Sequence, residues 1–508
     1  MRVLLWMVIV SAMSYPPRLT VTPAPGSVVS DVVELRVTSS EPLKRVEFWF
    51  NGHLMGTDTS TPYTWVWDTL PLAEGEHVVT VRATDMNDRV LSTEVRYVVR
   101  NDLSRGGAYY LERAREHLSS QRWEDALKAA RRAVRLLPDD GQAHHLLAQA
   151  WLGTSQWSKA VESAEQAAKR LPSPDTLATL AQAHLQVAFA QTVDQEKRFA
   201  SLQAAVDSAV RAGDMRLSHT RSSAERARAL AQLGRLEEAA ETYLQAGSTA
   251  DNLLAAARCY LLAGRWQDAD RMCNLAERRA ADKTTIGVYR ALAQALRGRN
   301  VEARQRLEQL SQTALVTMAR ANVALRERKP SEAIRILLPL RTQGTVSDVV
   351  DTLIMTALAE TRDFARAEDH FRDALLRNPL NWLALAQKGY ETLAVGSTAT
   401  ARRYFELAAR IRPDDAWVLC GQALCAEDRS RAVQLAQQAA KQAPDNPWTL
   451  VVLSSVQWRA GQLDEAMRHI ERARNLDRDN YNFGSPPDVR RAGQIARILG
   501  RRPALPLE

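Results

Sequence analysis

Residues 121–127 read QRWEDAL and residues 155–161 read SQWSKAV, which places Trp123 and Trp157 34 residues apart. The same frame returns as GRWQDA at residues 264–269, RDFARA at 362–367 and GQLDEA at 461–466. Each copy places a large side chain three positions before an alanine. Self-similarity at a fixed period of roughly 20–50 residues is typical of stacked repeats. This pattern therefore predicts a repeat architecture for most of the chain.

The small position of this frame can be followed through the whole helical part of the sequence. It recurs at a mean spacing of 34 residues, in steps of 30 to 42, at Ala126, Ala160, Leu202, Ala239, Ala269, Ala303, Ala333, Ala367, Ala401, Ala432 and Ala466. Apolar residues between these markers recur with the period of an amphipathic helix. A small residue is needed where two helices approach closely, and stacked neighbours bury the face that one helix pair leaves open.

This pattern resembles the tetratricopeptide repeat (TPR) family, whose unit is a pair of antiparallel helices. The resemblance implies a mainly α fold, a right-handed α-α superhelix of about 11 repeats. It also implies a concave groove lined by the first helix of each pair, at the position after its small residue. Carried over residue by residue, these positions are Arg115, Gln149, Gln191, Arg228, Arg258, Leu292, Asn322, Thr356, Tyr390, Gly421 and Ser455.

One repeat departs from this frame. The step that ends at Leu202 is eight residues longer than the mean, and Leu202 stands where alanine is expected. A longer first helix from Pro174 onward would accommodate the extra residues. A place of this kind is expected to bend the superhelix or to separate two stacks.

The region before the repeats has a different period. Between residues 18 and 100, short runs of β-branched and aromatic residues alternate with turn signals such as Asn51-Gly52. In residues 45–50 the alternation predicts that Val46, Phe48 and Phe50 face inward, whereas Glu47 and Trp49 face outward. Six or seven such strands suggest a small β-sandwich.

The order of residues in this region is similar to that of bacterial Ig-like domains. The residues that carry the likeness are Val46–Gly56, the motif PYTWVWDT at 62–69 and the motif EGEHVVTVRATD at 74–85. Domains of this family usually act as spacers or adhesive modules on exported proteins. The region contains no Cys, so apolar packing is expected to hold the two sheets together.

The predicted order is a signal peptide at 1–14, an Ig-like β-sandwich at 15–102, a TPR solenoid at 105–484 and a C-terminal capping helix and tail at 485–508. The first segment has one Arg, an apolar run and then small residues, which is the layout of a secretory signal. A buried first strand and a retained weak anchor are the alternatives. The step Gly106-Gly107 marks a hinge between sandwich and solenoid.

Composition and motifs argue against several classes of function. The net charge of +8 is spread over 67 basic and 59 acidic residues, so no basic stripe favours nucleic acid. The nine His form no metal-binding motif, and no phosphate-binding loop or nucleophile elbow occurs. Cys259 and Cys273 lack zinc spacing, and the sequence leaves their oxidation open. We therefore expect no enzyme activity, cofactor, metal site or transmembrane span.

These observations predict an exported protein-protein interaction scaffold, in the periplasm, on the cell surface or secreted. An accessory or regulatory subunit of an envelope polysaccharide or secretion enzyme system is the alternative. The expected partner is a protein or peptide with an acidic segment or a C-terminal carboxylate, because Arg pairs with carboxylates through two hydrogen bonds. The candidate groove residues are Arg115, Gln149, Gln191, Arg228, Arg258, Asn322 and Tyr390. Solvated side chains without a partner are the competing interpretation.

Overall fold

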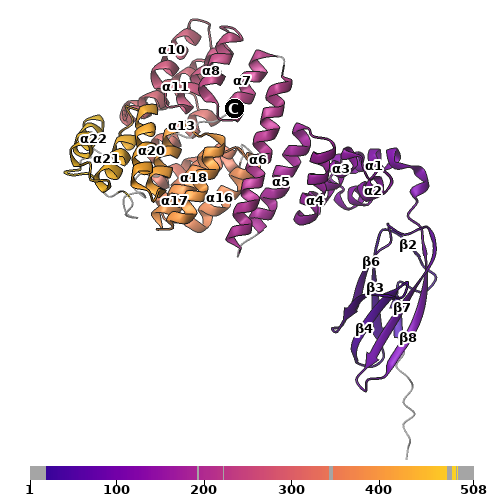
Figure 1. Ribbon diagram of the computed structural model, residues 1–508. Coiled ribbons are helices and arrows are strands. Elements are labelled where there is room, and N and C mark those ends of the chain that lie inside the picture. The colour runs from indigo at the N-terminus through magenta and orange to yellow at the C-terminus, as the bar shows by residue number, and fades with distance from the viewer. Residues whose placement is uncertain are drawn as a thin grey trace, which may run out of the picture. The chain divides into compact units, whose positions relative to one another are not determined.

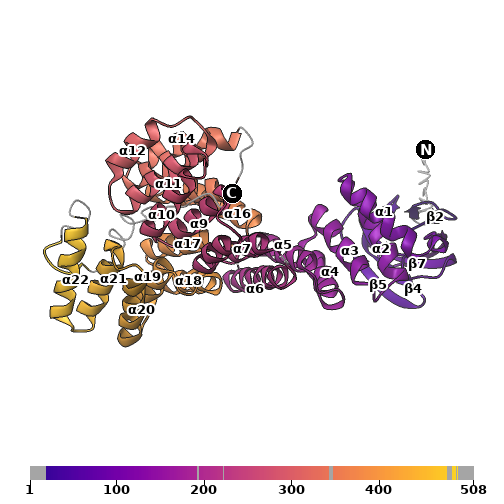
Figure 2. The same cartoon turned by 90° about the horizontal axis from the view of Figure 1, so that it is seen from above.

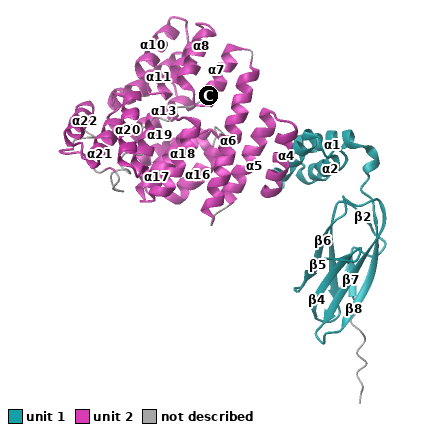
Figure 3. Cartoon of the chain, in the orientation of Figure 1, with its two compact units in different colours: residues 1–156 teal, residues 157–508 magenta. Residues whose placement is uncertain are grey.

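The structure is a computed structural model that describes residues 19–190, 194–220, 222–342, 347–477, 483–487 and 489 (Figure 1). The chain forms two compact units that meet between residues 156 and 157 (Figure 3). The expected signal peptide at 1–14 lies outside the described residues, as does most of the expected capping segment at 485–508.

The first unit begins with a β-sandwich of two sheets. A three-stranded sheet has the order β1-β3-β6, and a five-stranded sheet has the order β2-β8-β7-β4-β5. The strands are β1 (Leu19–Thr22), β2 (Val28–Val29), β3 (Val32–Ser39), β4 (Leu43–Phe50), β5 (His53–Asp58), β6 (Tyr63–Asp68), β7 (Gly75–Asp85) and β8 (Val90–Val99). The described residues thus hold eight strands, where the sequence suggests six or seven.

The core of the sandwich follows the predicted alternation. Val46, Phe48 and Phe50 are buried on β4, whereas Glu47 and Trp49 are partly exposed. The turn after β4 has Asn51 and Gly52 at positive φ, as a two-residue hairpin of the Asn-Gly type requires. The interpretation of this region as an Ig-like β-sandwich is confirmed.

Three helices complete the first unit: α1 (Gly107–Ser119), α2 (Trp123–Leu136) and α3 (Gly141–Gly153). Side chains of α2 contact the sandwich near Gly106-Gly107, where the sequence suggests a hinge. Arg132 pairs with buried Asp31 at 2.6 Å, and its Nε donates to the Asn101 carbonyl at 2.8 Å. Arg131 reaches Asp68 at 2.5 Å. These contacts fix the junction beside Gly106-Gly107.

The second unit consists of stacked helix pairs. With the first unit, the described residues hold 22 α-helices, which confirms the predicted solenoid of about 11 repeats. The helices of the second unit are α4 (Trp157–Arg170), α5 (Pro174–Ala190), α6 (Gln195–His219), α7 (Ser223–Gln232), α8 (Leu236–Gln245), α9 (Ala250–Leu262), α10 (Trp266–Glu277), α11 (Lys283–Leu296), α12 (Asn300–Glu308), α13 (Ala314–Arg326), α14 (Pro330–Thr342), α15 (Asp348–Glu360), α16 (Phe364–Arg377), α17 (Trp382–Ala394), α18 (Thr398–Ile411), α19 (Ala416–Cys425), α20 (Arg429–Gln442), α21 (Pro447–Arg459) and α22 (Leu463–Leu476).

Small residues let these helices approach, as the sequence predicts. All of the alanine markers are buried at 0–1% exposure. Phe405 on α18 lies between Gly389 of α17 and Gly421 of α19, and a Cβ on Gly421 would stand 2.1 Å from its ring. Gly421 therefore serves close packing, because a side chain at this position would overlap the ring.

The stretched repeat has an unexpected neighbour. Its helices α5 and α6 have 17 and 25 residues, and they lie beside α16 and α18 (Figures 1 and 2). Phe199 of α6 packs edge-to-face on Tyr404 of α18 at 4.9 Å between ring centroids, and Phe189 packs on Phe371 at 6.1 Å. Leu202 is fully buried in the same core. We call this contact the seam; a solenoid with only nearest-neighbour contacts would lack it.

Candidate partner-binding site

The predicted groove residues fall into different places. Arg115 and Gln149 belong to the first unit, where Arg115 is exposed and pairs with Glu112 at 3.1 Å. Arg228 and Arg258 belong to the second unit and are exposed and partly buried, respectively. Gln191 lies outside the described residues.

The inner positions of the later repeats lie in the core. Asn322 and Tyr390 are each 1% exposed, and the Tyr390 hydroxyl donates to the Trp417 carbonyl at 2.6 Å. Leu292, Thr356, Gly421 and Ser455 are buried as well. In the TPR family, the residue after the small residue of each first helix is expected to line a solvent-filled groove. In these repeats that residue is buried, because the helices are covered on both faces. Asn322 and Tyr390 are not available to a partner in this conformation.

Arg228 and Arg258 are brought together around one hydroxyl group. Burial raises the pKa of Tyr243 on α8, and the positive charges of Arg258 and Arg228 oppose that shift. Among the described residues, no acceptor reaches the buried Nε of Arg258. The two guanidinium groups thus concentrate positive charge at the junction of α7, α8 and α9.

An open groove of about 770 Å³ lies on one side of α7. Its walls are the start of α5, the end of α6 and one face of α7. The lining residues are Pro172, Ser173, Pro174, Met215, Arg216, His219, Thr220, Glu225, Arg228, Ala229 and Gln232. On α7, Glu225, Arg228, Ala229 and Gln232 follow at steps of three and four, which place them on one helix face. We call this space the edge groove.

The edge groove lies at the C-terminal end of the long helix α6. Helix α6 runs for 25 residues, whereas α7 has only 10. The residue after α7, Leu233, packs against Gly213, so the extra turns of α6 lie toward its start, away from the groove. The eight extra residues in the sequence are the signal for this irregularity. Arg216 and His219 at the end of α6 were not among the predicted residues, because they follow no position of the regular frame.

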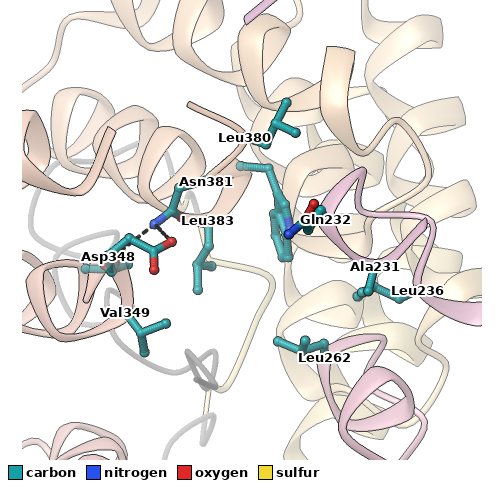
Figure 4. A pocket seen from close by; sticks show the side chains of 11 residues that line it. Ala231, Gln232, Leu236, Leu262, Asp348, Val349, Leu380, Asn381 and Leu383 are labelled. Carbon is teal, nitrogen blue, oxygen red and sulfur yellow. Dashed lines mark hydrogen bonds between the residues drawn. The ribbon is translucent and has the colours of Figure 1, made fainter. Parts of the chain in front are cut away.

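A small inner cavity of about 30 Å³ lies near α7, between α8 and α9 and the helices α15 and α17 (Figure 4). Its polar lining is paired within itself. Asn381 donates to Asp348 at 3.1 Å and to the Thr352 hydroxyl at 3.0 Å. Burial raises the pKa of Asp348. A space that holds about one water molecule, with a single titratable lining residue, offers no catalytic pair.

A buried ionic cluster lies at the seam. Lys388 of α17 contacts Glu391 at 2.6 Å and Glu368 of α16 at 2.8 Å, and Arg198 of α6 also pairs with Glu368. Burial alone would raise the pKa of Glu368, but Lys388 and Arg198 lower it. Burial raises the pKa of Glu391. The charges of the two acids, Glu368 and Glu391, oppose those of Lys388 and Arg198. Because these residues lie on α6, α16 and α17, the ion pairs join helices across the seam.

Reactive and metal-binding groups do not converge in the described part of the chain. All four cysteines are free and buried, so the pairing of Cys259 with Cys273 that the sequence left open is not formed. Burial raises the pKa of Cys259 to about 11 and that of Cys273 to about 12, which keeps both thiols protonated at neutral pH. Among the described residues, no group of His, Cys, Asp or Glu could hold a metal ion. None of the described helices is long and apolar enough to cross a membrane.

Comparison with known families agrees with this architecture. Residues 18–81 match the bacterial Ig domain family. Residues 111–175, 354–416 and 423–482 match tetratricopeptide repeat families.

Among curated proteins, cellulose synthase operon protein C of Komagataeibacter xylinus is 31% identical over 109 residues. That stretch is 20% of this chain and 8% of the relative's length.

Two solved structures are among those similar to parts of this chain. The APC/C hetero-tetramer Cut9-Hcn1 is 12% identical with a TM-score of 0.41, over 74% of this chain and 82% of that chain. The fibronectin(III)-like modules of Clostridium thermocellum CbhA are 23% identical with a TM-score of 0.15, over 16% of this chain and 94% of that chain. The chain is a tetratricopeptide-repeat protein that carries a bacterial Ig domain ahead of its repeats.

Proposed function

We propose that this protein is a non-catalytic interaction scaffold that works outside the cytoplasm and binds a protein partner through its second unit. The observation that carries the proposal is the pair Arg228 and Arg258 at Tyr243, beside the open edge groove. Two Arg side chains can bind carboxylates by charge-assisted hydrogen bonds. An acidic segment or a C-terminal carboxylate is the partner that suits them.

Two further observations support this function. Tetratricopeptide repeats imply a protein-interaction scaffold, and a bacterial Ig domain is consistent with an extracytoplasmic location. In the inner cavity, Asn381 is bonded to Asp348 and Thr352, and Asp348 is the single titratable residue of the lining.

The similarity to cellulose synthase operon protein C favours the more specific alternative. In that case the protein is an accessory subunit of an envelope polysaccharide system, and its partner is another protein of that system. The Ig domain would then hold the solenoid at a set distance from its attachment.

A capture experiment tests the scaffold function. Tagged full-length protein, expressed in its own cells, should copurify a defined partner from envelope fractions. The variant Arg228→Glu/Arg258→Glu should lose that partner. Arg299→Glu/Arg335→Glu, with the same change of charge just before α12 and on α14, should retain it. Equal capture by all three proteins would refute the role of the two arginines. Loss of extracellular polysaccharide on gene deletion would support the accessory role.

A further inference from the structure

The edge groove has the chemistry of a peptide site of its own. It is formed by the start of α5, the end of α6 and one face of α7. Its lining contains Arg216, His219 and Arg228 against one acid, Glu225. The predicted groove positions of the later repeats are buried, whereas the edge groove is open and contains the predicted residue Arg228.

The charges of this groove are available to a ligand. The only ion pair that Arg216 makes within the described residues is with Asp175, at 3.6 Å, and both side chains are exposed, at 49% and 81%. An exposed pair of this kind contributes at most about 1 kcal/mol and exchanges readily for a better partner. Arg228 is exposed, and its positive charge lowers the pKa of the Tyr243 hydroxyl.

The other lining residues of the edge groove are apolar side chains and polar side chains that are already hydrogen-bonded. Pro172, Pro174 and Met215 supply apolar surface between the two cations. The Thr220 hydroxyl donates to the Arg216 carbonyl at 2.7 Å, and His219 bonds to the Met215 carbonyl at 2.6 Å. These polar groups are occupied by the end of α6, so the arginines remain the principal charged contacts.

The start of α7 adds a second observation that favours an anion. Ser222 precedes the helix, but its side chain caps none of the first amide groups. Free N–H groups and the helix dipole stabilise a negative charge at such an end. Glu225 lies in the first turn of this helix and Arg228 in the second.

From these contacts we propose that the edge groove binds an internal, extended acidic segment of the protein partner, with carboxylates at Arg216 and Arg228 and an apolar residue on Met215 and the prolines. The proposal rests on the scaffold function above and specifies its site. A fully hydrated polysaccharide would leave the apolar floor unused. The two separate arginines suit an internal segment, which can present more than one carboxylate, better than a single chain-end carboxylate.

Fluorescence anisotropy with short labelled peptides tests this proposal on the purified full chain. The probe carries Glu-Leu-Glu motifs separated by Gly and Ser and is blocked at both ends. A second probe has Gln for every Glu and a free C-terminal carboxylate, and a third has Lys for every Glu. We expect binding of the first probe only, weakened by salt because the contacts are between charges.

Variants decide whether the peptide lies in the edge groove. Arg216→Glu/Arg228→Glu should weaken binding of the acidic probe by about tenfold or more, and it should gain affinity for the Lys probe. Arg299→Glu/Arg335→Glu should bind as the unmodified chain does. Preference for the free carboxylate, or equal loss in both variants, would overturn the proposal. If no probe binds while partner capture persists, the edge groove is wrong and the scaffold function stands; loss of capture as well refutes both.

Discussion

Phe199 on α6 lies edge-to-face on Tyr404 of α18, with 4.9 Å between the ring centroids. The two helices belong to the third and the ninth helix pair, so this contact joins distant parts of the second unit. In a simple repeat array each pair contacts only its neighbours, and unfolding can proceed from either end. The seam ties the third pair to later pairs, and we expect it to make unfolding of the second unit more cooperative.

Replacing Phe199 with Ala should test this coupling. Removal of a buried Phe side chain costs about 3–5 kcal/mol of unfolding free energy, and loss of the seam should separate one transition into two. Urea unfolding followed by circular dichroism measures both effects. Trp458→Ala, at a side chain that is 42% exposed, is the control and should change stability much less. Unchanged cooperativity in Phe199→Ala would contradict the role of the seam.

Gly421→Ala tests the close packing of the later repeats. The added Cβ would stand 2.1 Å from the Phe405 ring, so the helices must separate or the ring must move. Overpacking of this kind costs roughly 1–3 kcal/mol. We expect a lower midpoint of thermal unfolding. The double variant Gly421→Ala/Phe405→Leu should recover part of the loss, and no recovery would mean that the ring is not the obstacle.

The ionic cluster at the seam predicts a dependence on pH. Lys388 and Arg198 hold the pKa of Glu368 below its usual value of 4.5 despite the opposing effect of burial. Glu368 therefore stabilises the fold above that value, and its contribution is lost as the pH falls through the folded-state pKa. Glu368→Gln should thus be less stable than the unmodified chain at neutral pH, with a smaller difference in acid.

Thermal unfolding of both proteins between neutral and acid pH measures this difference. Glu391 shifts in the opposite direction because burial raises its pKa, and the charge of Glu368 adds to that rise. The comparison is therefore repeated in a Glu391→Gln background. A stability difference that does not change with pH would rule out a linkage through Glu368.

The junction of the Ig domain with the first repeat depends on Arg132. This side chain pairs with buried Asp31 at 2.6 Å and donates to the Asn101 carbonyl at 2.8 Å. Arg132→Ala leaves the buried carboxylate with Arg131 alone, at 3.7 Å, and should loosen the junction. Limited proteolysis should then cleave near residues 100–107 several times faster. Arg113→Ala, at an exposed pair on α1, should leave the rate unchanged.

The repeat frame and the sandwich could be predicted from the sequence because both depend on local patterns. An alanine at the close-packing position predicts which face of a helix is buried. The alternation around Phe48 predicts which face of a strand is buried. The seam could not be predicted, since nothing in the residues around Phe199 identifies a partner six pairs further along the chain. Only the extra length before Leu202 indicated that this repeat is different.

The candidate site was predictable in part. Arg228 and Arg258 follow from the family's position rule, and they do meet, at Tyr243. Asn322 and Tyr390 follow from the same rule but are buried, because the rule assumes an inner wall that stays open to water. Arg216 lies outside the regular frame, at the end of the long helix α6.

Site-specific photocrosslinking in living cells tests the binding of a partner at the edge groove most directly. A photoreactive residue at Ser173, on the groove wall, is compared with one at Arg335, outside the groove. We expect an adduct to one envelope protein from position 173 only, and mass spectrometry should place the crosslink in an acidic segment of that protein. Adducts of equal yield from both positions, or a crosslink to a basic or neutral segment, would contradict it.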